Sequence, residues 1–381
     1  MFLIPLAFYI VPAISDIHRD NISLKDTKDR IGVAQIFDYK ISEKERLYYT
    51  PDIVWGANKA WVNSFSTYYI PYDRDPDKER NFEWYKKNYP DKVIYKCDMK
   101  TPANSFKYDY GYLTPINISD REIVDYIFDR EIKKAIDSGY DAIALDNVYS
   151  SNKFHRCGIF KNRKWIRLYS DEYNDPIYDK SVLDHITFLR EKINKAGLKL
   201  AINIAYEDNN LYKKISRIAD IIVDESGFSR KCRPIESGKI WRLRINSLAK
   251  NAENKGVVII DQTCEKESDI NGENIQWTIA NYLLVRGGST YLSISGESYG
   301  GKNNLISFQK NIGLAKESMQ PIGVGYKREY TKGIVIANYS TTDNLYYNLE
   351  KSEDYVDYLR NKNTSNPIII GPLQSIILHK N

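Results

Sequence analysis

The sequence has few of the residues that bind zinc. Its four cysteines, at positions 97, 157, 232 and 264, are far apart and form no Cys-x-x-Cys pair. Its four histidines form neither a His-x-His nor a His-Glu-x-x-His pattern. Zinc sites draw on such closely spaced ligands, so we expect no metal site. No glycine-rich phosphate loop follows the first apolar run, and we expect no cofactor.

The sequence also lacks a block of like charge and a long apolar run. Its 55 basic and 50 acidic residues give a net charge of +5 that is spread along the chain, so charge patterning does not favour a nucleic-acid partner. The apolar stretch Met1–Ser15 (MFLIPLAFYIVPAIS) is too short for a comfortable transmembrane span, and nothing later approaches one. We therefore expect no nucleic-acid partner and no stable membrane span. The oligomeric state stays open.

The apolar start of the chain has two interpretations. Ala13-Ile14-Ser15 has the small-x-small form of a signal-peptidase site, which predicts a protein that is secreted or displayed at the cell surface. The positive n-region of such a signal is missing, and two prolines interrupt the run. The alternative is an N-terminal segment that packs on the rest of the protein. We favour the signal peptide.

Tyrosine is the residue in clear excess, with 31 copies. Its apolar ring and polar tip suit sugars and other amphipathic ligands. A general bias toward Lys, Asn, Ile and Tyr in the source proteome would give the same count, so composition alone does not decide between the two explanations.

From about residue 30, short apolar runs alternate with amphipathic helical stretches, which predicts parallel strands with helical crossovers. Several runs lack polar alternation, as strands buried on both faces do. A doubly wound sheet would alternate in the same way, but the count of eight favours a (β/α)8 TIM barrel. The predicted strands are residues 31–37, 60–65, 93–97, 142–145, 198–203, 221–223, 257–260 and 290–294.

Two of the intervening helices carry clear end signals. Ser119-Asp-Arg-Glu122 has the form of a capping box, and Gly139 is placed to end the helix that it begins. A second helix is expected from about Ser181 to Gly197. Further helices are expected over 240–252 and 275–285.

From about Pro321 the pattern changes to short β runs separated by Gly, Pro, Asn and Ser, which is typical of a small all-β module. The expected organisation is an N-terminal segment over 1–27, a catalytic barrel over 28–320 and a β-sandwich over 321–381. The predicted strands of the module are 333–338, 345–348, 355–359, 368–370 and 375–378.

Chemistry in a TIM barrel takes place at the carboxyl ends of the strands and in the loops that follow them. Several polar residues fall there in the predicted barrel, although each acidic one could instead cap the next helix. They are Asp38, Asn63, Asp98, Asp146, Asn147, Asn203, Asp224, Glu225, Asp261 and Gln262.

Asp146 and Glu225 stand out in this group because Asp146 follows an apolar run directly and Glu225 lies just past one. A carboxylate buried at the barrel mouth is costly unless it is paired or used. Cleavage of a glycosidic bond needs two carboxyl groups, one ionised and one protonated. Strands four and six end on the same rim, so the pair could flank such a bond, but the sequence does not separate retaining from inverting spacing.

Aromatic residues near the predicted second strand and after the fourth could stack on sugar rings. Trp61 and Tyr69 belong to a cluster with Trp55, Tyr68 and Tyr72, close to charged residues 73–75. Packing on the outside of the barrel is an equal alternative for any one of them. Tyr149 follows Asp146 and is better placed by topology.

Two segments of the sequence resemble segments of a known enzyme family. Gly139-Tyr-Asp-Ala-Ile-Ala-Leu-Asp-Asn-Val148 and Asp224-Glu-Ser-Gly-Phe228 resemble the strand-four and strand-six segments of barrel glycoside hydrolases related to the endo-α-1,4-polygalactosaminidases. The resemblance implies that Asp146 is the nucleophile and Glu225 the general acid/base. Ala142 stands where that group usually has Gly, and Asp224 where it often has Asn.

The last 60 or so residues carry a second resemblance. Arg328–Ser340 and Gly371–Leu378 resemble the small β-sandwich that closes many barrel glycosidases. Together the two imply a retaining glycoside hydrolase that cleaves a polysaccharide or oligosaccharide, with polar rim residues and aromatic side chains binding the substrate. A non-catalytic carbohydrate-binding or structural surface or virion protein on such a barrel is the main alternative. Metal-dependent hydrolysis is a weaker one, because histidines are few.

Overall fold

The computed structural model describes most of the chain after residue 22. The predicted signal segment Met1–Ser15, Cys232, Gln262 and Cys264 lie outside the described residues. The described ranges are 23–225, 227–230, 233–234, 238–261, 272–294, 299–302, 311–349, 355–358 and 366–380.

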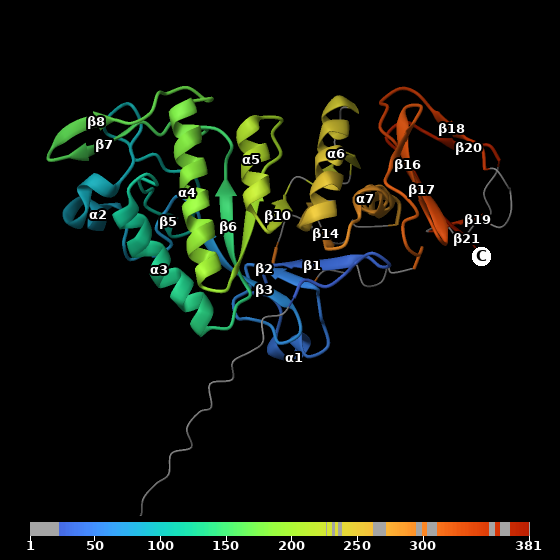
Figure 1. Ribbon diagram of the computed structural model, residues 1–381, viewed down its shortest axis with the longest axis horizontal. Coiled ribbons are helices and arrows are strands. Elements are labelled where there is room, and N and C mark those ends of the chain that lie inside the picture. The colour runs from blue at the N-terminus through green and yellow to red at the C-terminus, as the bar shows by residue number, and fades with distance from the viewer. Residues whose placement is uncertain are drawn as a thin grey trace, which may run out of the picture.

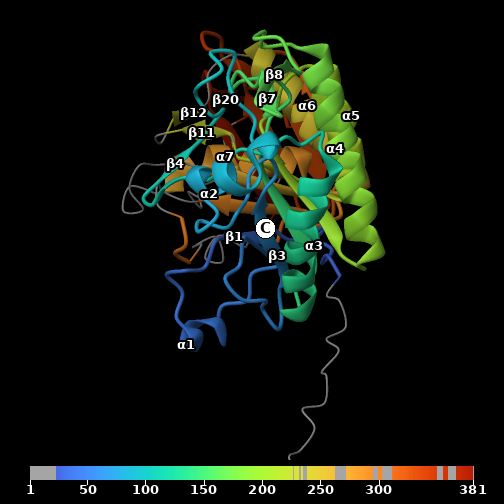
Figure 2. The same cartoon turned by 90° about the vertical axis from the view of Figure 1, so that its left-hand side faces the viewer.

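Eight parallel strands close into a barrel, which confirms the predicted TIM-barrel class (Figure 1). Each strand pairs with its neighbours in chain order, and the first pairs with the last. Helices lie outside the barrel, and Figure 2 shows α3, α4 and α5 along one side of it. The barrel strands are β1 (Gly32–Ile36), β2 (Ile53–Trp55), β3 (Phe65–Pro71), β6 (Ala142–Val148), β9 (Lys199–Ile204), β10 (Ile221–Asp224), β13 (Gly256–Asp261) and β14 (Thr290–Ile294).

Alternate residues of each strand face the barrel interior and the surrounding helices. The interior set forms one buried cluster, which includes Ala142 and Ala144 of β6 and Ile221 and Val223 of β10. The residues between them pack in other clusters, together with residues of the helices. Apolar residues on both faces explain why these runs lack polar alternation. The two-residue period also fixes which rim residues point inward.

The helices begin near the predicted positions, but two of their starts differ. Asp120, not Ser119, caps α3 (Arg121–Asp137), because its carboxylate accepts from the backbone amides of residues 122 and 123. The second helix, α4 (Pro176–Lys195), starts earlier than Ser181, with Asp175 as its cap. The others are α1 (Glu43–Arg46), α2 (Phe82–Asn88), α5 (Asn210–Ile218), α6 (Gly238–Asn254), α7 (Gly272–Val285) and a 3-10 turn over Pro90–Lys92.

Two of the predicted strands are wrong. Residues 60–64 lie in the connection from β2 to β3, where Val62 is 81% exposed, and only Phe65 of the predicted strand belongs to β3. Residues 93–97 are not a barrel strand, because Val93 and Tyr95 make only isolated bridges to residues of the loops after β3 and β6. Both runs are rich in aromatic and β-branched residues, and in residues 93–95 these are buried although they form no barrel strand, so composition alone does not identify a strand. The true second and third strands are β2 and β3.

The loops after β3 and β6 are long and carry two small hairpins, β4–β5 (Lys107–Tyr108 and Gly111–Tyr112) and β7–β8 (Gly158–Lys161 and Lys164–Arg167). A disulfide between Cys97 and Cys157 joins the two loops. The short pair β11–β12 (Ser229–Arg230 and Arg233–Pro234) follows β10. All of these additions lie on the side of the barrel where the carboxyl ends of the strands meet.

Removing this disulfide is expected to destabilise the protein. The bond links cysteines 60 residues apart in the sequence, and cross-links of that span contribute roughly 2–4 kcal/mol to the free energy of unfolding. A variant with both Cys97→Ser and Cys157→Ser should show that loss in urea denaturation. Reducing agent should lower the wild-type midpoint toward that of the variant. Equal midpoints for the oxidised wild type and the variant would contradict the expected contribution.

The C-terminal strands form two antiparallel sheets, as the β-sandwich prediction requires. Buried residues of both sheets, such as Ile336 and Ile370, form one cluster between them. The larger sheet packs on α7, where Arg328 donates to the carbonyls of residues 283, 284 and 286 at the helix end (Figure 1). The sheets contain β15 (Gln320–Ile322), β16 (Gly325–Tyr330), β17 (Gly333–Asn338), β21 (Ser375–Lys380) and β19 (Tyr355–Asp357), and β18 (Leu345–Tyr347) with β20 (Ile368–Ile370).

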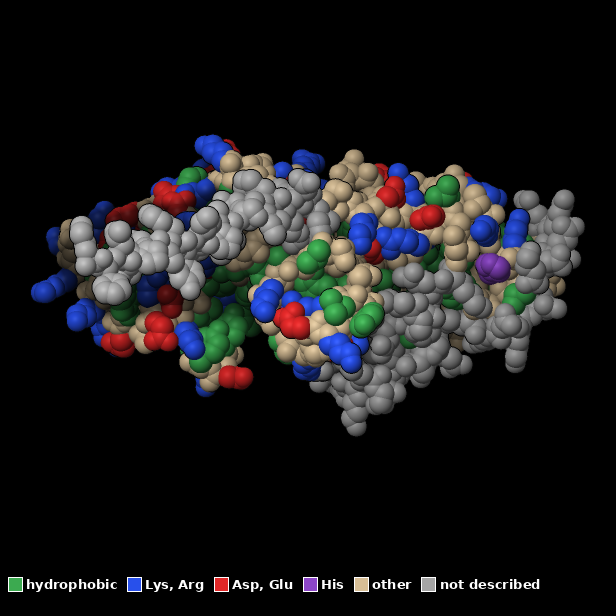
Figure 3. Space-filling view, turned by 90° about the horizontal axis from the view of Figure 1, so that it is seen from below, with side chains coloured by type: hydrophobic (Ala, Val, Ile, Leu, Met, Phe, Trp, Pro, Cys, Tyr) green, Lys and Arg blue, Asp and Glu red, His purple; other side chains and the backbone are tan. Residues whose placement is uncertain are grey.

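Charged side chains of both signs are interspersed over the face of the molecule in Figure 3. Within the described residues, no helix combines the length and apolarity needed to cross a membrane.

Candidate active site

The carboxylate of Asp146 lies at a β-bulge near the end of β6. The pairing register between β6 and β9 shifts between Leu145 and Val148. Asn147 adopts a left-handed conformation with φ of 59°, which asparagine tolerates better than most residues. Bulges of this kind redirect side chains beside active sites. Asp146 follows the inward-facing residues Ala142 and Ala144 at the two-residue spacing of the strand.

Three donors hold the Asp146 carboxylate. The hydroxyl of Tyr69 donates to Oδ2 at 2.6 Å, and the side-chain amide of Asn147 donates to the same oxygen at 2.6 Å. The side-chain amide of Asn203 donates to Oδ1 at 2.7 Å. Hydrogen bonds from neutral donors to an ionised carboxylate stabilise its charged form. Tyr69, Asn147 and Asn203, which the sequence analysis proposed as substrate-binding residues, therefore all contact Asp146.

Asn203 also joins the two candidate catalytic carboxylates. Its Nδ2 atom lies 2.7 Å from Asp146 Oδ1 and 2.8 Å from Glu225 Oε2. These two oxygens are therefore within about 5.5 Å of each other, which is the separation typical of retaining rather than inverting glycosidases. Asn203 is 6% exposed, so the bridge is well sheltered.

Glu225 reaches the site from the end of β10. It is one of the inward-facing series with Ile221 and Val223, and its side chain is exposed. The hydroxyl of Tyr299, in the loop after β14, donates to its Oε1 at 2.9 Å. Tyr299 was not among the sequence-predicted site residues. It lies five positions beyond the strand, and no pattern in that loop marks it.

The two carboxylates have different surroundings. Burial raises the pKa of Asp146, and the negative charge of Glu225 raises it further, while the bonds from Tyr69 and Asn203 oppose both effects. Burial also raises the pKa of Tyr69, as does the charge of Asp146, so this tyrosine is neutral and donates. Burial favours the protonated form of Asp146, so the ionised form that a nucleophile needs depends on the hydrogen bonds that this carboxylate accepts.

Asp224 and Asp261 point away from the site. Each occupies the outward-facing position of its strand. Asp224 is 1% exposed and is paired with Arg244 of α6. Asp261 is fully buried and accepts from the backbone amide of Phe228 and from Thr278 of α7. Both carboxylates tie a strand end to a helix, so the structure does not bring them to the other site residues.

Asp38 and Trp61 form a hydrogen bond with each other. The indole Nε1 of Trp61 donates to Asp38 Oδ2 at 2.8 Å, and Arg46 pairs with the same oxygen at 2.7 Å. The backbone amide of Asn58 donates to Oδ1 at 2.9 Å. Asp38 is 1% and Trp61 5% exposed. These partners occupy the polar atoms that were expected to bind substrate.

Asn63 and Asp98 do not lie at the ends of barrel strands. Asn63 precedes β3, at the amino end of the barrel, where its carbonyl accepts from Lys25. Its expected position at the mouth is wrong, because residues 60–65 are a connection. Asp98 is exposed and accepts from the backbone of Lys100 and from both the backbone and the hydroxyl of Thr101. It stabilises a turn in the long loop after β3.

Aromatic rings surround the carboxylates. Tyr149, in the loop after β6, is half-buried, and the charge of Asp146 adds to burial in raising its pKa. Its ring lies 6.3 Å from that of Phe106 and 5.1 Å from that of Phe154. Phe37, at the end of β1, lies 5.7 Å from Tyr69. The mouth thus offers apolar ring faces next to acidic oxygens, which suits a sugar ring.

Metal ligands do not gather in the described ranges. No group of three or more His, Cys, Asp or Glu side chains there could hold an ion. The chemistry that the described side chains can supply is proton transfer and nucleophilic attack by carboxyl groups.

Comparisons with known proteins give no family. No family model matches the chain, and no curated protein matches it. Among solved structures, a GH27 β-L-arabinopyranosidase from Geobacillus stearothermophilus is 10% identical with a TM-score of 0.43, and the match covers 73% of this chain and 66% of that one. A GH31 dextranase from Flavobacterium johnsoniae is 10% identical with a TM-score of 0.47, covering 93% of this chain and 52% of that one.

An α-amylase from Malbranchea cinnamomea is 11% identical with a TM-score of 0.41, covering 83% of this chain and 74% of that one. The chain spans 44% to 66% of the length of the first three structures found. These structures are glycoside hydrolases at low similarity, and neither a substrate nor a set of catalytic residues follows from them.

Proposed function

We propose that the protein is a retaining glycoside hydrolase that cleaves a polysaccharide or oligosaccharide, with Asp146 as nucleophile and Glu225 as general acid/base. One observation carries the proposal: a single amide, that of Asn203, bonds both carboxylates and holds their nearest oxygens within about 5.5 Å. The resemblance to polygalactosaminidase-like hydrolases agrees with the roles of the two residues. It does not extend to the sugar.

The hydrogen bonds to each carboxyl group support its role. Asp146 accepts three hydrogen bonds, which favour the ionised form that attacks the anomeric carbon. Glu225 is exposed, and among the described residues Asn203 donates to its Oε2 and Tyr299 to its Oε1. It can therefore exchange protons with water, as a residue must that first protonates the leaving oxygen and then activates water.

A polysaccharide screen tests the proposal. Purified protein is incubated with neutral, amino-sugar and acidic polymers, and release of reducing ends is measured. For any polymer that is cleaved, NMR of the first products shows whether the anomeric configuration is kept. Retention is expected. Inversion would contradict the assigned roles, and no release from any polymer would favour the non-catalytic, carbohydrate-binding alternative.

The pH profile offers a second test. Because burial raises the pKa of Asp146, the nucleophile is lost as pH falls through that raised value, and the acid limb of kcat/KM should lie above the ordinary aspartate value of about 4. Tyr69→Phe removes a bond that lowers this pKa. It should move the acid limb up by roughly one pH unit.

Tyr68→Phe is the matched control for this shift. Tyr68 adjoins Tyr69 in β3 but faces outward, where its hydroxyl donates to Glu131 of α3 at 2.8 Å. The control should leave the acid limb where it is in the wild type. An equal shift in both variants would show that the profile does not report on Asp146.

We also propose that the protein works outside the reducing cytoplasm. The Cys97–Cys157 disulfide supports this, because such bonds persist mainly in oxidising compartments. Non-reducing mass spectrometry of the protein from its native host would detect the bond, and two free thiols at these positions would contradict the proposal.

A further inference from the structure

Arg74 lies beside the candidate active site, in the loop that follows β3, and is 1% exposed. Its Nε atom is 3.0 Å from Asp73 Oδ1. Within the described part of the chain, none of its three guanidinium nitrogens makes a hydrogen bond of acceptable geometry. A buried guanidinium whose N–H groups make no hydrogen bonds is costly, so this arrangement calls for an acceptor that the described residues do not supply.

The buried charges around Arg74 do not balance. Asp73 is shared between two guanidinium groups, because Arg156 pairs with its other oxygen. All three residues are at most 2% exposed. His185 does not alter the sum, since burial lowers its pKa to about 4 and leaves it neutral at pH 7. Counted by themselves, Asp73, Arg74 and Arg156 therefore carry one positive charge in excess, and an anionic group bound beside Arg74 would offset it.

The Arg74 guanidinium is close to the residues that would bind a sugar. Its charge acts on the hydroxyls of Tyr69, Tyr108 and Tyr149, which are all half-buried. Tyr69 donates to Asp146. The hydroxyl of Tyr108 is itself buried and has no hydrogen-bond partner among the described residues. The N–H groups of Arg74 and the hydroxyl of Tyr108 are thus hydrogen-bond donors without acceptors among the described residues, close to the proposed nucleophile. The ring of Phe106 lies 5.5 Å from the guanidinium.

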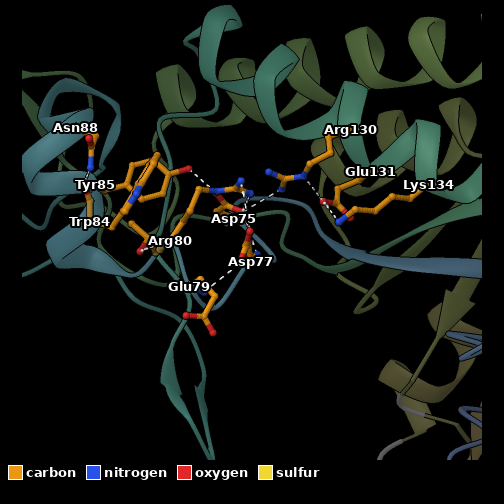
Figure 4. A network of polar contacts seen from close by, with 11 residues as sticks. Asp75, Asp77, Glu79, Arg80, Trp84, Tyr85, Asn88, Arg130, Glu131 and Lys134 are labelled. Atoms are coloured by element: carbon orange, nitrogen blue, oxygen red, sulfur yellow. Dashed lines mark hydrogen bonds and ion pairs between the residues drawn. The ribbon is translucent and has the colours of Figure 1, made fainter.

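The loop that carries Arg74 is otherwise well bonded. Arg80 donates to both oxygens of Asp75 at 2.6 and 2.7 Å, and Tyr85 donates to Asp75 at 2.6 Å. Figure 4 shows these side chains and Arg130 of α3 converging on Asp75. A loose loop is therefore not the reason that Arg74 lacks acceptors. Asp75, the next residue in the sequence, has hydrogen-bond partners for both of its carboxylate oxygens.

We propose that Arg74 and Tyr108 bind an anionic substituent, a carboxylate or a sulfate ester, on the sugar held beside Asp146, so that the substrate is an acidic polysaccharide. This inference rests on the proposed glycosidase function. The planar guanidinium offers two parallel N–H groups, a geometry that matches the two oxygens of a uronic acid carboxylate. The tyrosine hydroxyl supplies a further donor to the same group.

Calorimetric titration of the full chain with matched monosaccharides tests the subsite. D-Glucuronate and D-glucose differ only in the group at carbon 6, as do D-galacturonate and D-galactose, and D-glucose 6-sulfate distinguishes sulfate from carboxylate. For the wild type we expect at least one acidic sugar to bind about tenfold more tightly than its neutral partner. Arg74→Gln should abolish the preference, and Arg74→Lys should keep part of it, since lysine retains charge but not the planar fork. Arg217→Gln, at an exposed position of α5, is the control and should bind as the wild type does.

Three results would overturn the proposal: equal binding of acidic and neutral sugars by the wild type, no binding of either, or a preference that persists in folded Arg74→Gln. If Arg74→Gln does not fold, the wild-type preference and the Arg74→Lys variant decide. Failure of the anion-binding proposal can be distinguished from failure of the glycosidase proposal. A preference for acidic sugars in a protein that cleaves no polymer would refute only the catalytic function, and cleavage of neutral polymers without any preference would refute only the subsite.

Discussion

Asp146→Asn is expected to lower kcat for polysaccharide hydrolysis by about 10⁴-fold or more, the scale seen when a nucleophile is removed. The variant keeps the size of the side chain but cannot form a covalent bond to the anomeric carbon. Release of reducing ends under substrate saturation measures the effect. Binding of the polymer should persist, because the surrounding donors and rings are unchanged.

The control for this variant is Asp137→Asn, which alters an exposed carboxylate at the end of α3. It should hydrolyse at the wild-type rate. Circular dichroism and a urea titration of both variants establish that they are folded. Wild-type hydrolysis by folded Asp146→Asn would remove the residue from the mechanism and with it the proposed chemistry.

Asn203→Asp is expected to have the second largest effect. The change is almost isosteric, but it replaces the amide that bonds both carboxylates with a third carboxylate. Loss of one such donor typically costs 10²–10³-fold in rate. The added negative charge should also raise the pKa values of the group, so kcat/KM should fall by about that factor at neutral pH.

We also expect the free energy of unfolding of Asn203→Asp to depend on pH. A carboxylate whose pKa is raised by folding lowers stability at pH values above that pKa, and the penalty disappears as the group is protonated. The loss of stability in Asn203→Asp should therefore be largest at neutral pH and shrink as the pH falls toward 4. Asn344→Asp, at an exposed loop position, should show neither effect. A pH-independent loss would indicate a packing defect rather than repulsion between carboxylates.

The sequence was sufficient to predict which residues at the strand ends face the barrel interior, because side chains alternate between the two faces of a strand. Asp146 directly follows an apolar run and Glu225 lies one residue past another, and their two-residue spacing from Ala144 and Val223 places both on the inward face. The same period assigns Asn203 inward and Asp224 and Asp261 outward. The two outward aspartates could have been separated from the site on that ground. Their acidic character at a strand end was the misleading feature.

Other parts of the site depend on contacts that no local pattern records. Tyr299 reaches Glu225 from a loop 74 residues further along the chain. Asp38 and Trp61 looked like substrate-binding groups, but the folded chain pairs them with each other and with Arg46. Residues 93–97 have the composition of a strand, yet they are buried by the loops around them.

By itself, the sequence determined the barrel class, the strand on which each proposed catalytic carboxylate lies and the C-terminal sheets. Buried strands appear in a sequence as short apolar runs, and turn residues such as Gly, Pro, Asn and Ser separate them. Only the tertiary structure decided that the amide of Asn203 donates to both carboxylates, that a disulfide joins the two long loops and that the buried Arg74 makes no hydrogen bond of acceptable geometry within the described residues. These features arise where separate loops meet at the barrel mouth. Their free energies depend on distances between segments that are remote in sequence, and no local pattern encodes those distances.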